Sequence, residues 1–308
     1  MKALITGGAG FIGSHLVEEL NKRHIFCAVV DDLSKGSEKN LRGSKYDFFK
    51  LNICSPNLSS VIKKIKPDLI FHLAAQTNIA LSNKKPDLDL KINLLGTLNL
   101  LNSLKKAPPE KLIFASSSAV YGNSIRFPIR EDSPKRPFSV YGISKYSSEL
   151  SISNWAKEYS ISHAIMRFSN VYGEKQDSSA EGGVVSIFIN NLLKGVPVAV
   201  FGNGGQTRDF IYVKDVISAI LKSMDMGIAG IFNVSTSNET SINKLLDLLE
   251  GITQKKAKRL YSKRKFIEVE KSIISYAKLL KETKWNPKTK LKDGLEKTYE
   301  YFKTGLKR

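Results

Sequence analysis

Four tyrosines in this chain are followed by a lysine four residues later, a spacing that places both side chains on one face of a helix. The pairs are Tyr46/Lys50, Tyr141/Lys145, Tyr261/Lys265 and Tyr299/Lys303. A phenol with a pKa of about 10 is a poor base at neutral pH, but a nearby ammonium group favours its ionised form. Such a pair can therefore move a proton at a hydroxyl group. The spacing alone does not single out one of the four.

A glycine pattern near the start of the chain predicts a binding site for a dinucleotide. Gly7, Gly10 and Gly13 lie between an apolar segment expected to be a strand and an amphipathic segment expected to be a helix. In that position a tight turn allows backbone N–H groups to approach a pyrophosphate, and the helix N-terminus adds positive potential. A glycine turn without a ligand is the alternative interpretation.

Two carboxylates indicate which dinucleotide is bound. Asp31 and Asp32 stand about twenty residues after the glycines, at the end of the next apolar segment. A carboxylate there can accept hydrogen bonds from the adenosine ribose hydroxyls and would repel a 2′-phosphate. The pattern therefore favours NAD over NADP.

The elements that must position these residues alternate along the first half of the chain. Strands are expected at 2–6, 25–31, 46–51, 68–75, 111–117 and 163–169, and helices at 11–22, 88–104 and 139–158. Strands that are apolar throughout and alternate with helices indicate a parallel sheet covered on both faces, an α/β Rossmann-like doubly wound fold. After about Tyr172 the alternation loosens, with helices expected at 184–194, 213–224, 241–250 and 291–304. We expect a nucleotide-binding domain over 1–172, to which some later segments return, and a smaller mixed α/β substrate lobe over 173–308.

Composition narrows the class of protein. The 308 residues contain no run of 18 apolar residues, and the N-terminus lacks the apolar stretch of a signal peptide, so a cytoplasmic globular protein is expected. Cys27 lies in an apolar run and is expected to be a buried thiol without a chemical role. The four histidines are scattered, so no metal site is predicted.

The chain is basic, with a net charge of +19. Residues 255–308 hold 18 Lys and Arg against 6 Asp and Glu, a net charge of +12. A nucleic-acid surface and a solvated lysine-rich face are the two interpretations. Because no aromatic-interleaved RNA-binding motif accompanies the charge, we favour the solvated face.

Further motifs resemble a known family. The chain contains LAAQ (73–76), INLLGT (92–97), SSSAVYG (116–122), YGISK (141–145), RFSNVYG (167–173) and QTRDFIYVKDV (206–216). With the Gly-x-x-Gly-x-x-Gly turn, their order is similar to that of the extended short-chain dehydrogenases/reductases, the NAD-dependent epimerases and dehydratases of nucleotide sugars. The resemblance selects Tyr141/Lys145 among the four pairs.

The resemblance implies a role for each matching residue. Tyr141 would be the acid/base, Lys145 its partner, and Ser117, flanked by Ser116 and Ser118, the catalytic hydroxyl. The residues expected to bind NAD are Gly7, Gly10, Phe11, Ile12, Gly13, Asp31, Asp32, Ser34, Gly36, Asn52, Ile53, Leu73, Ala74, Ala75, Asn93, Tyr141, Lys145 and Phe168. The residues expected to bind substrate are Gln76, Ser117, Tyr141, Asn170, Val185 and Arg208, with Asn170 and Arg208 on the diphosphate.

Several of these residues have a second interpretation. Asn93 could instead bond loop backbone, and Arg208 could form a surface ion pair with Asp209 or Asp215. Ser118 is better interpreted as a turn residue than as a catalyst. In the C-terminal region the family's phosphate-binding Arg and ribose-binding Asp align with Glu268 and Ile273, and Arg264 or Lys265 could substitute after a small shift.

The resemblance also implies a reaction. Family dehydratases carry an Asp-Glu pair directly after the catalytic hydroxyl residue, whereas this chain has Ser118 and Ala119 there. Transient oxidation of the sugar to a 4-keto intermediate with return of hydride to the other face is expected, as in interconversion of UDP-glucose and UDP-galactose. A homodimer through segments 88–104 and 139–158 is expected. An oxidoreductase of the same fold and, less favoured, a nucleic-acid-binding protein on this scaffold are the alternatives.

Overall fold

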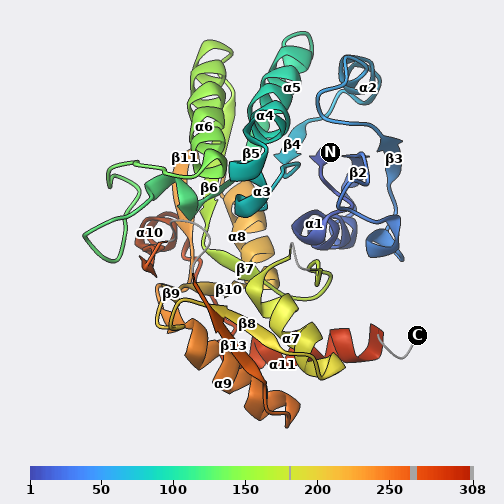
Figure 1. Cartoon of the computed structure of the whole chain (residues 1–308). Helices are drawn as coiled ribbons and strands as arrows, with labels where there is room; N and C mark the ends of the chain where they lie inside the picture. Colours follow the sequence, from blue (N-terminus) through green and yellow to red (C-terminus); the bar gives the residue numbers. More distant parts are fainter. Residues whose placement is uncertain (180–181, 264–268, 306–308) are drawn as a thin grey trace.

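A computed structural model describes residues 1–179, 182–263 and 269–305. Its centre is a parallel sheet of seven strands in the order β11-β6-β5-β4-β1-β2-β3 (Figure 1). The strands are β1 (Lys2–Thr6), β2 (Phe26–Asp31), β3 (Asp47–Lys50), β4 (Leu69–His72), β5 (Lys111–Ser117), β6 (Ser162–Phe168) and β11 (Gly230–Val234). The predicted Rossmann-like fold is confirmed.

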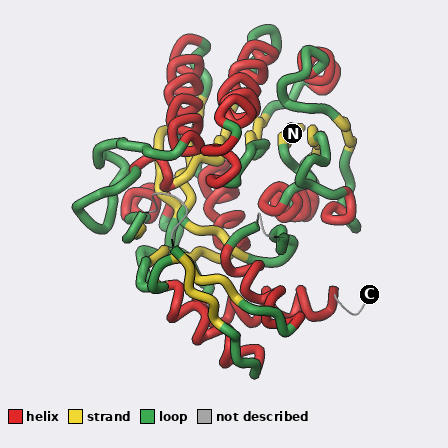
Figure 2. The backbone as a smooth tube through the Cα atoms, in the orientation of Figure 1, coloured by secondary structure: helices red, strands yellow, loops and turns green. Residues whose placement is uncertain are grey.

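Helices cover both faces of this sheet, as Figure 2 shows. The helices are α1 (Phe11–Lys22), α2 (Leu58–Ile65), α3 (Ile79–Lys84), α4 (Pro86–Leu90), α5 (Gly96–Leu104), α6 (Val140–Glu158) and α8 (Val213–Asp225). Successive residues of β1 point to opposite faces: Ile5 packs in one core cluster with α1 and α8, and Leu4 in another with α2, α5 and α6. The central strands β1, β2 and β4 are mostly apolar because both of their faces are buried.

The remaining elements form a smaller lobe below the sheet in Figure 1. They are β7 (Asn170–Tyr172), α7 (Val184–Lys194), β8 (Val198–Phe201), β9 (Thr207–Arg208), β10 (Phe210–Tyr212), β12 (Thr240–Ser241), α9 (Ile242–Thr253), β13 (Arg259–Ser262), β14 (Lys271–Ser272), α10 (Ala277–Thr283) and α11 (Leu291–Gly305). The chain also contains two short 3-10 helices, η1 (Glu38–Leu41) and η3 (Ser118–Tyr121).

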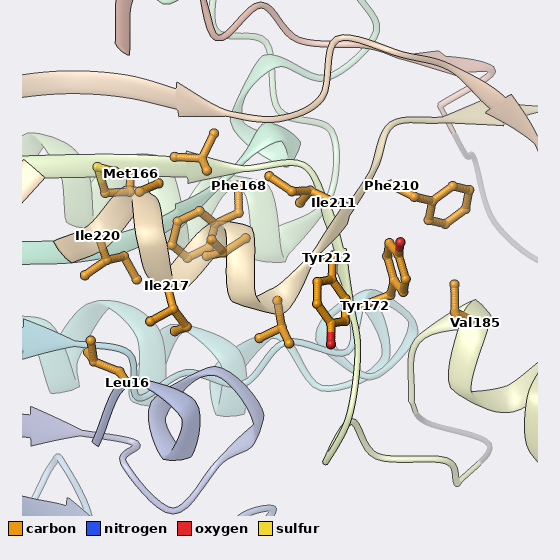
Figure 3. Packing of buried hydrophobic residues seen from close by; sticks show 14 of the residues in the cluster. Leu16, Met166, Phe168, Tyr172, Val185, Phe210, Ile211, Tyr212, Ile217 and Ile220 are labelled. Atoms are coloured by element: carbon orange, nitrogen blue, oxygen red, sulfur yellow. The ribbon is translucent and has the colours of Figure 1, made fainter. Parts of the chain in front are cut away.

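One apolar core continues from the sheet into the smaller lobe (Figure 3). It joins Leu16 of α1 and Ile217 of α8 to Phe168 at the end of β6, and runs on to Tyr172 and Val185. The lobes are therefore packed on a shared set of side chains. Across the described ranges, no helix is both long and apolar enough to cross a bilayer.

Two expectations about helices need correction. The segment expected to be one helix over 88–104 is α4, a π-helical turn η2 (Lys91–Leu95) and α5. The buried Asn93 sits in the middle of that turn, and π-turns of this kind often occur where a polar side chain has a specific task. Helices α2 and α3 were not predicted, although Leu58, Ile62 and Ile65 have helical spacing in α2 and are buried.

Candidate active site at the carboxyl edge of the sheet

The predicted site residues come from segments that follow the ends of neighbouring parallel strands. The glycine turn follows β1, Asp32 follows β2, Leu73 follows β4 and Ser117 ends β5. These ends lie at one edge of the sheet because the strands are parallel and adjacent. Ligands of doubly wound sheets bind at this edge.

The glycine turn is shaped for close approach of another group. Gly7 has φ +71°, and a Cβ there would lie 2.7 Å from the Ala74 amide nitrogen. A Cβ on Gly13 would lie 2.2 Å from the Gly7 carbonyl oxygen, so helix α1 could not start where it does. At Gly10, the N-cap of α1, no side chain caps the helix, and a Cβ would meet only the Gly7 oxygen at 3.1 Å. The backbone N–H groups at this helix start remain available to an anion, as a dinucleotide pyrophosphate requires.

The two predicted carboxylates have different surroundings. Asp31 is buried and accepts hydrogen bonds from the amides of Ala9 (3.0 Å) and Leu33 (2.9 Å), which tie the glycine turn to β2. Burial raises the pKa of Asp31. Asp32 is half-buried and accepts from the Ser34 amide (2.9 Å) and the Asn52 side chain (2.7 Å). Burial would raise the pKa of Asp32, but these hydrogen bonds hold it below its usual value.

Other predicted cofactor residues lie around these two carboxylates. Gly36 is close enough that a Cβ would come within 3.0 Å of Asp31 Oδ1. Ile53 is buried in the core against Gly96, and the half-buried Phe11 and Ile12 pack against the core in the first turn of α1. The segment from Leu73 to Ala75 is half-buried, and the Ala74 amide donates to Thr6 Oγ1 (3.3 Å).

A buried histidine beneath this segment was missed by sequence reasoning. His72 is hydrogen-bonded through Nδ1 to Thr6 Oγ1 (2.7 Å) and through Nε2 to Thr97 Oγ1 (2.9 Å). Thr97 donates its own hydroxyl proton to the Asn93 carbonyl (2.6 Å), so Nε2 of His72 carries the proton and Nδ1 accepts. Burial lowers the pKa of His72 to about 3, so the ring is neutral. His72 therefore supports the segment from Leu73 to Ala75, which is expected to bind the cofactor.

The tyrosine predicted to be catalytic lies in the first turn of α6. Ser139 caps this helix by accepting from the Gly142 amide (3.0 Å), and Tyr141 is buried with the Ser117 side chain acting on its hydroxyl group. Ser117 Oγ also accepts from the Ala119 amide (3.1 Å), which orients it as the N-cap of η3. The predicted acid/base and the predicted hydroxyl therefore lie together at the end of β5.

The charge state of Tyr141 differs from the expectation drawn from Lys145. Burial raises the pKa of Tyr141 to about 12, and the hydrogen bond from Ser117 only partly opposes this. The Lys145 ammonium group donates to the Ala115 carbonyl (2.8 Å) and lies 4.7 Å from the centre of the Phe114 ring. Burial lowers the pKa of Lys145 to about 8. In the protein alone, desolvation determines the direction in which the pKa of Tyr141 shifts.

The Tyr299/Lys303 pair has the same spacing as Tyr141/Lys145 but lies in different surroundings. Tyr299 and Lys303 lie on α11 with the ammonium 5.3 Å from the ring centre, but Lys303 is partly exposed and pairs with Glu300 (3.2 Å). This pair has neither the buried surroundings nor a serine partner of the Tyr141 kind. Burial at a strand end, rather than spacing, distinguishes the candidate catalytic pair.

Asn93 and Gln76 are joined by two hydrogen bonds. Asn93 Oδ1 accepts from the Gln76 amide (2.8 Å), and Asn93 Nδ2 donates to the Gln76 carbonyl (3.0 Å). The Gln76 side chain donates to the Asn78 carbonyl (3.0 Å) and to Asp89 (3.0 Å). Bonding of Asn93 to loop backbone, one of its two interpretations, is thus present. The ligand contacts predicted for Asn93 and Gln76 stay predictions.

A second buried network, next to the serine predicted to be catalytic, was also missed. Arg167 and Glu149 form an ion pair in which Nη2 and Oε2 are 2.6 Å apart and the side chains are 0% and 2% exposed. Ser116 donates to Glu149 Oε1 (2.5 Å), and Arg167 Nη1 donates to the Tyr121 hydroxyl (2.9 Å). Tyr121 in turn donates to Asn233 of β11 (2.6 Å). Ser116, the neighbour of Ser117, is therefore a structural anchor.

The predicted residues of the smaller lobe lie around β7, β9 and α7. Asn170 begins β7, and its amide donates to the Asp209 carbonyl (2.9 Å). Arg208 is half-buried and donates to the carbonyls of Thr207 (2.8 Å) and Val269 (2.7 Å). The side chains of Phe168 and Val185 pack in the core of Figure 3, so their predicted ligand contacts also stay predictions.

The ion-pair interpretation of Arg208 is not supported by the surroundings of the two candidate carboxylates. Asp209 is buried and accepts from the Thr236 hydroxyl (2.7 Å) and the Ser237 amide (3.0 Å). Asp215 accepts from the amides of Lys288 (3.2 Å) and Thr289 (3.0 Å).

The structure describes only one of the four C-terminal residues that align with, or could replace, the nucleotide-binding residues of the family. Arg264, Lys265 and Glu268 lie outside the described residues. The Ile273 carbonyl accepts from the Ile129 amide (2.9 Å), which joins this segment to the loop after η3.

Many basic side chains of the C-terminal region have local partners. They include Lys255 on the Leu193 carbonyl, Lys256 and Arg259 on Glu250, Lys271 on Glu239, and Lys278 on the Ile231 carbonyl. The interpretation of the region as a solvated lysine-rich face stays a prediction.

Comparison with known proteins identifies the family. The chain belongs to the NAD-dependent epimerase/dehydratase family, whose model matches residues 3–235. A putative UDP-glucose 4-epimerase from Methanocaldococcus jannaschii is 38% identical over 97% of this chain and 98% of its own length. The family prediction and the predicted NAD dependence are confirmed.

Solved structures of this family have the same fold. UDP-glucose 4-epimerase from Thermotoga maritima, crystallised with UDP-glucose, matches with a TM-score of 0.95 and 38% identity over 99% of this chain and 100% of that one. UDP-glucuronic acid 4-epimerase from Bacillus cereus, in complex with UDP-glucuronic acid and NAD, matches with a TM-score of 0.92 and 30% identity over 99% of each chain. Related chains of this fold therefore act on different sugars.

Proposed function

We propose that this chain is an NAD-dependent 4-epimerase of a nucleotide sugar, with UDP-glucose and UDP-galactose as its substrate pair. The observation that carries the proposal is the buried Tyr141, on whose hydroxyl group the side chain of Ser117, at the end of β5, acts. The similarity to UDP-glucose 4-epimerases supports the choice of sugar, and the UDP-glucuronic acid epimerase is the alternative that the test must include.

The residues of the site divide the work of epimerisation at a sugar carbinol. When bound at the glycine turn, NAD+ supplies a hydride acceptor and a positive charge that favours the Tyr141 phenolate. Tyr141 removes the hydroxyl proton and returns it later, a role that typically contributes about 10²–10⁴-fold to the rate. Ser117 hydrogen-bonds the same sugar oxygen and can relay its proton. Lys145, whose ammonium group donates to the Ala115 carbonyl, provides a cation close to Tyr141 and Ser117.

The residues after Ser117 favour epimerase over dehydratase. Elimination of water from the sugar needs a carboxylic acid and a carboxylate near the leaving hydroxyl, and this chain places Ser118 and Ala119 at the start of η3. Neither side chain can act as a general acid at neutral pH. The keto intermediate is therefore expected to be reduced again.

The test is conversion of nucleotide sugars without added reductant. Purified protein is incubated with NAD+ and UDP-glucose, UDP-N-acetylglucosamine or UDP-glucuronic acid in separate reactions, and products are followed by proton NMR. Formation of UDP-galactose from UDP-glucose is the expected result. Conversion of another sugar alone would correct the substrate, and net accumulation of reduced cofactor would favour an oxidoreductase instead.

Neutralising Asp32 is expected to weaken the preference for NAD+ over NADP+. In Asp32→Asn, loss of the charge removes repulsion of the 2′-phosphate, and the ratio of the two dissociation constants should fall by about tenfold, or about 1.4 kcal/mol. Isothermal titration with each cofactor measures the ratio. Asp47→Asn makes the same change in net charge at the exposed start of β3 and should leave the ratio unchanged. An unchanged ratio in Asp32→Asn would contradict this assignment.

We also propose a homodimer formed by the face that α5 and α6 present side by side in Figure 1. Apolar side chains are exposed there, including Leu95 (54%) and Leu150 (56%), together with Leu98 and Ile143. A second copy of the same face is the expected occupant because it would cover these side chains symmetrically.

Charges in this face should separate the subunits. The wild type is expected to have the mass of a dimer in light scattering at micromolar concentration, and Leu95→Glu/Leu150→Glu that of a monomer. Met226→Glu, an equally exposed apolar residue just after α8, should leave the mass unchanged. A monomeric wild type would contradict the proposal.

A further inference from the structure

A carboxylate is buried beside the catalytic helix, and nothing in the proposed mechanism uses it. Asp89 of α4 is 0% exposed. Its Oδ1 accepts from Ser144 Oγ (2.5 Å) and Asn93 Nδ2 (3.2 Å), and its Oδ2 accepts from Gln76 Nε2 (3.0 Å). Burial of a carboxylate is costly unless such donors are present.

The three donors come from three separate parts of the site. Ser144 precedes Lys145 on α6, Asn93 belongs to the π-helical turn, and Gln76 ends the segment that follows β4. Asp89 therefore joins the catalytic helix to the loop expected to lie along cofactor and substrate. Movement of the segment that holds Gln76 would remove the donor to Oδ2, and movement of α6 or of the π-helical turn would remove one of the two donors to Oδ1.

The donors to Asp89 are all neutral, and a nearby cation would stabilise its charged form further. The Lys145 ammonium is buried and acts on Asp89 electrostatically, and Asp89 acts on Lys145 in return. The other titratable groups that face Lys145 are Glu149, one helical turn further along α6, and the neutral His72 of β4. Asp89 also faces the Tyr141 phenol.

We infer that Asp89 is a positioning residue for the Tyr141–Lys145 pair: its buried carboxylate fixes α6 against the 73–78 loop and supplies the counter-charge of Lys145. This inference rests on the proposed function for its kinetic consequence, but its electrostatic part does not. A purely structural residue would hold α6 in place without changing the titration of the pair.

The sign of the effect follows from the charge of Asp89. A nearby negative charge disfavours the phenolate and favours the ammonium, so it raises the pKa of both Tyr141 and Lys145. In Asp89→Asn both pKa values should fall. Tyr141 loses its proton at lower pH, and Lys145 loses its positive charge at lower pH. The whole pH profile of kcat should then move toward acid by roughly one pH unit.

Two measurements test this in the full-length chain with NAD+ bound. The first is the pH profile of kcat for sugar conversion. The second is NMR titration of ring-labelled tyrosine, with the Tyr141 signal assigned from Tyr141→Phe, which requires no turnover. Asp87→Asn changes an exposed carboxylate on the same short helix and is the matched control. It should change neither the pH profile of kcat nor the titration of Tyr141.

The outcomes separate the inference from the proposed function. A lower Tyr141 titration midpoint in Asp89→Asn supports the inference even if no sugar is converted, in which case the proposed function alone fails. An unchanged midpoint in Asp89→Asn overturns the inference, whether or not activity falls.

A thermal measurement keeps the inference testable if Asp89→Asn alone folds poorly. Lys145→Met leaves the Asp89 charge buried without its cation, and Asp89→Asn/Lys145→Met removes both charges. The double variant should therefore melt at a higher temperature than Lys145→Met. A double variant that melts lower would overturn the counter-charge assignment.

Discussion

Replacing Tyr141 with phenylalanine is expected to lower kcat for epimerisation by about 10²–10⁴-fold, the usual contribution of a positioned acid/base. The ring would still fill its buried place at the start of α6, so the fold and cofactor binding should change little. The hydroxyl lost is the one on which Ser117 acts, and Ser117 alone has no group to take up the proton it relays. Initial rates by NMR, together with titration of NAD+, measure the two effects separately.

The matched control for this variant is Tyr299→Phe. Tyr299 has a lysine at the same spacing on α11, but the pair lies at the surface away from the strand ends. It should retain full activity. A Tyr141→Phe protein that binds NAD+ and keeps more than about a tenth of the wild-type rate would exclude Tyr141 as the main acid/base.

Breaking the buried ion pair of Arg167 and Glu149 is expected to lower the free energy of unfolding by about 3–5 kcal/mol. In Arg167→Met, the Glu149 carboxylate would stay in the core with only Ser116 as a donor, and the Tyr121 hydroxyl would lose the Arg167 bond. Urea unfolding followed by circular dichroism measures the change. Arg130→Met breaks a pair 3.9 Å long between exposed side chains and should have no measurable effect.

A double variant distinguishes loss of the charge pair from loss of packing. Arg167→Met/Glu149→Leu removes both charges and should recover part of the stability lost in Arg167→Met, since no uncompensated charge stays buried. If the double variant is as unstable as the sum of the two single variants, the charges of the pair do not interact as proposed. Because Ser116 is next to Ser117, Arg167→Met should also reduce activity.

The residues that sequence analysis located best are those in a local pattern. The glycine turn, the strand before it and helix α1 were predicted with the bounds that the structure has, because apolar periodicity and glycine positions are both local signals. Tyr141 and Ser117 were brought together by matching motifs in order along the chain. Their proximity depends on how α6 docks on β5, which no single segment encodes.

The residues missed were those whose role depends on burial. Asp89, Glu149 and Arg167 look like ordinary charges of amphipathic segments, and only packing of distant elements shows that they are fully buried. The same cause reversed the expectation for Tyr141. A lysine one turn away predicts a lower pKa, but the extent of desolvation was not visible in the sequence, and it raises that pKa to about 12.

The late position of β11 in the chain has a consequence for folding during synthesis. Strand β11 pairs along β6, yet it is synthesised only after residues 173–229, which belong mostly to the smaller lobe. Until it emerges from the ribosome, β6 is an open edge and the Tyr121 hydroxyl lacks Asn233. The nucleotide-binding half cannot finish folding ahead of the other half. A nascent chain arrested near residue 172 would therefore expose a sheet edge that chaperones or aggregation could capture.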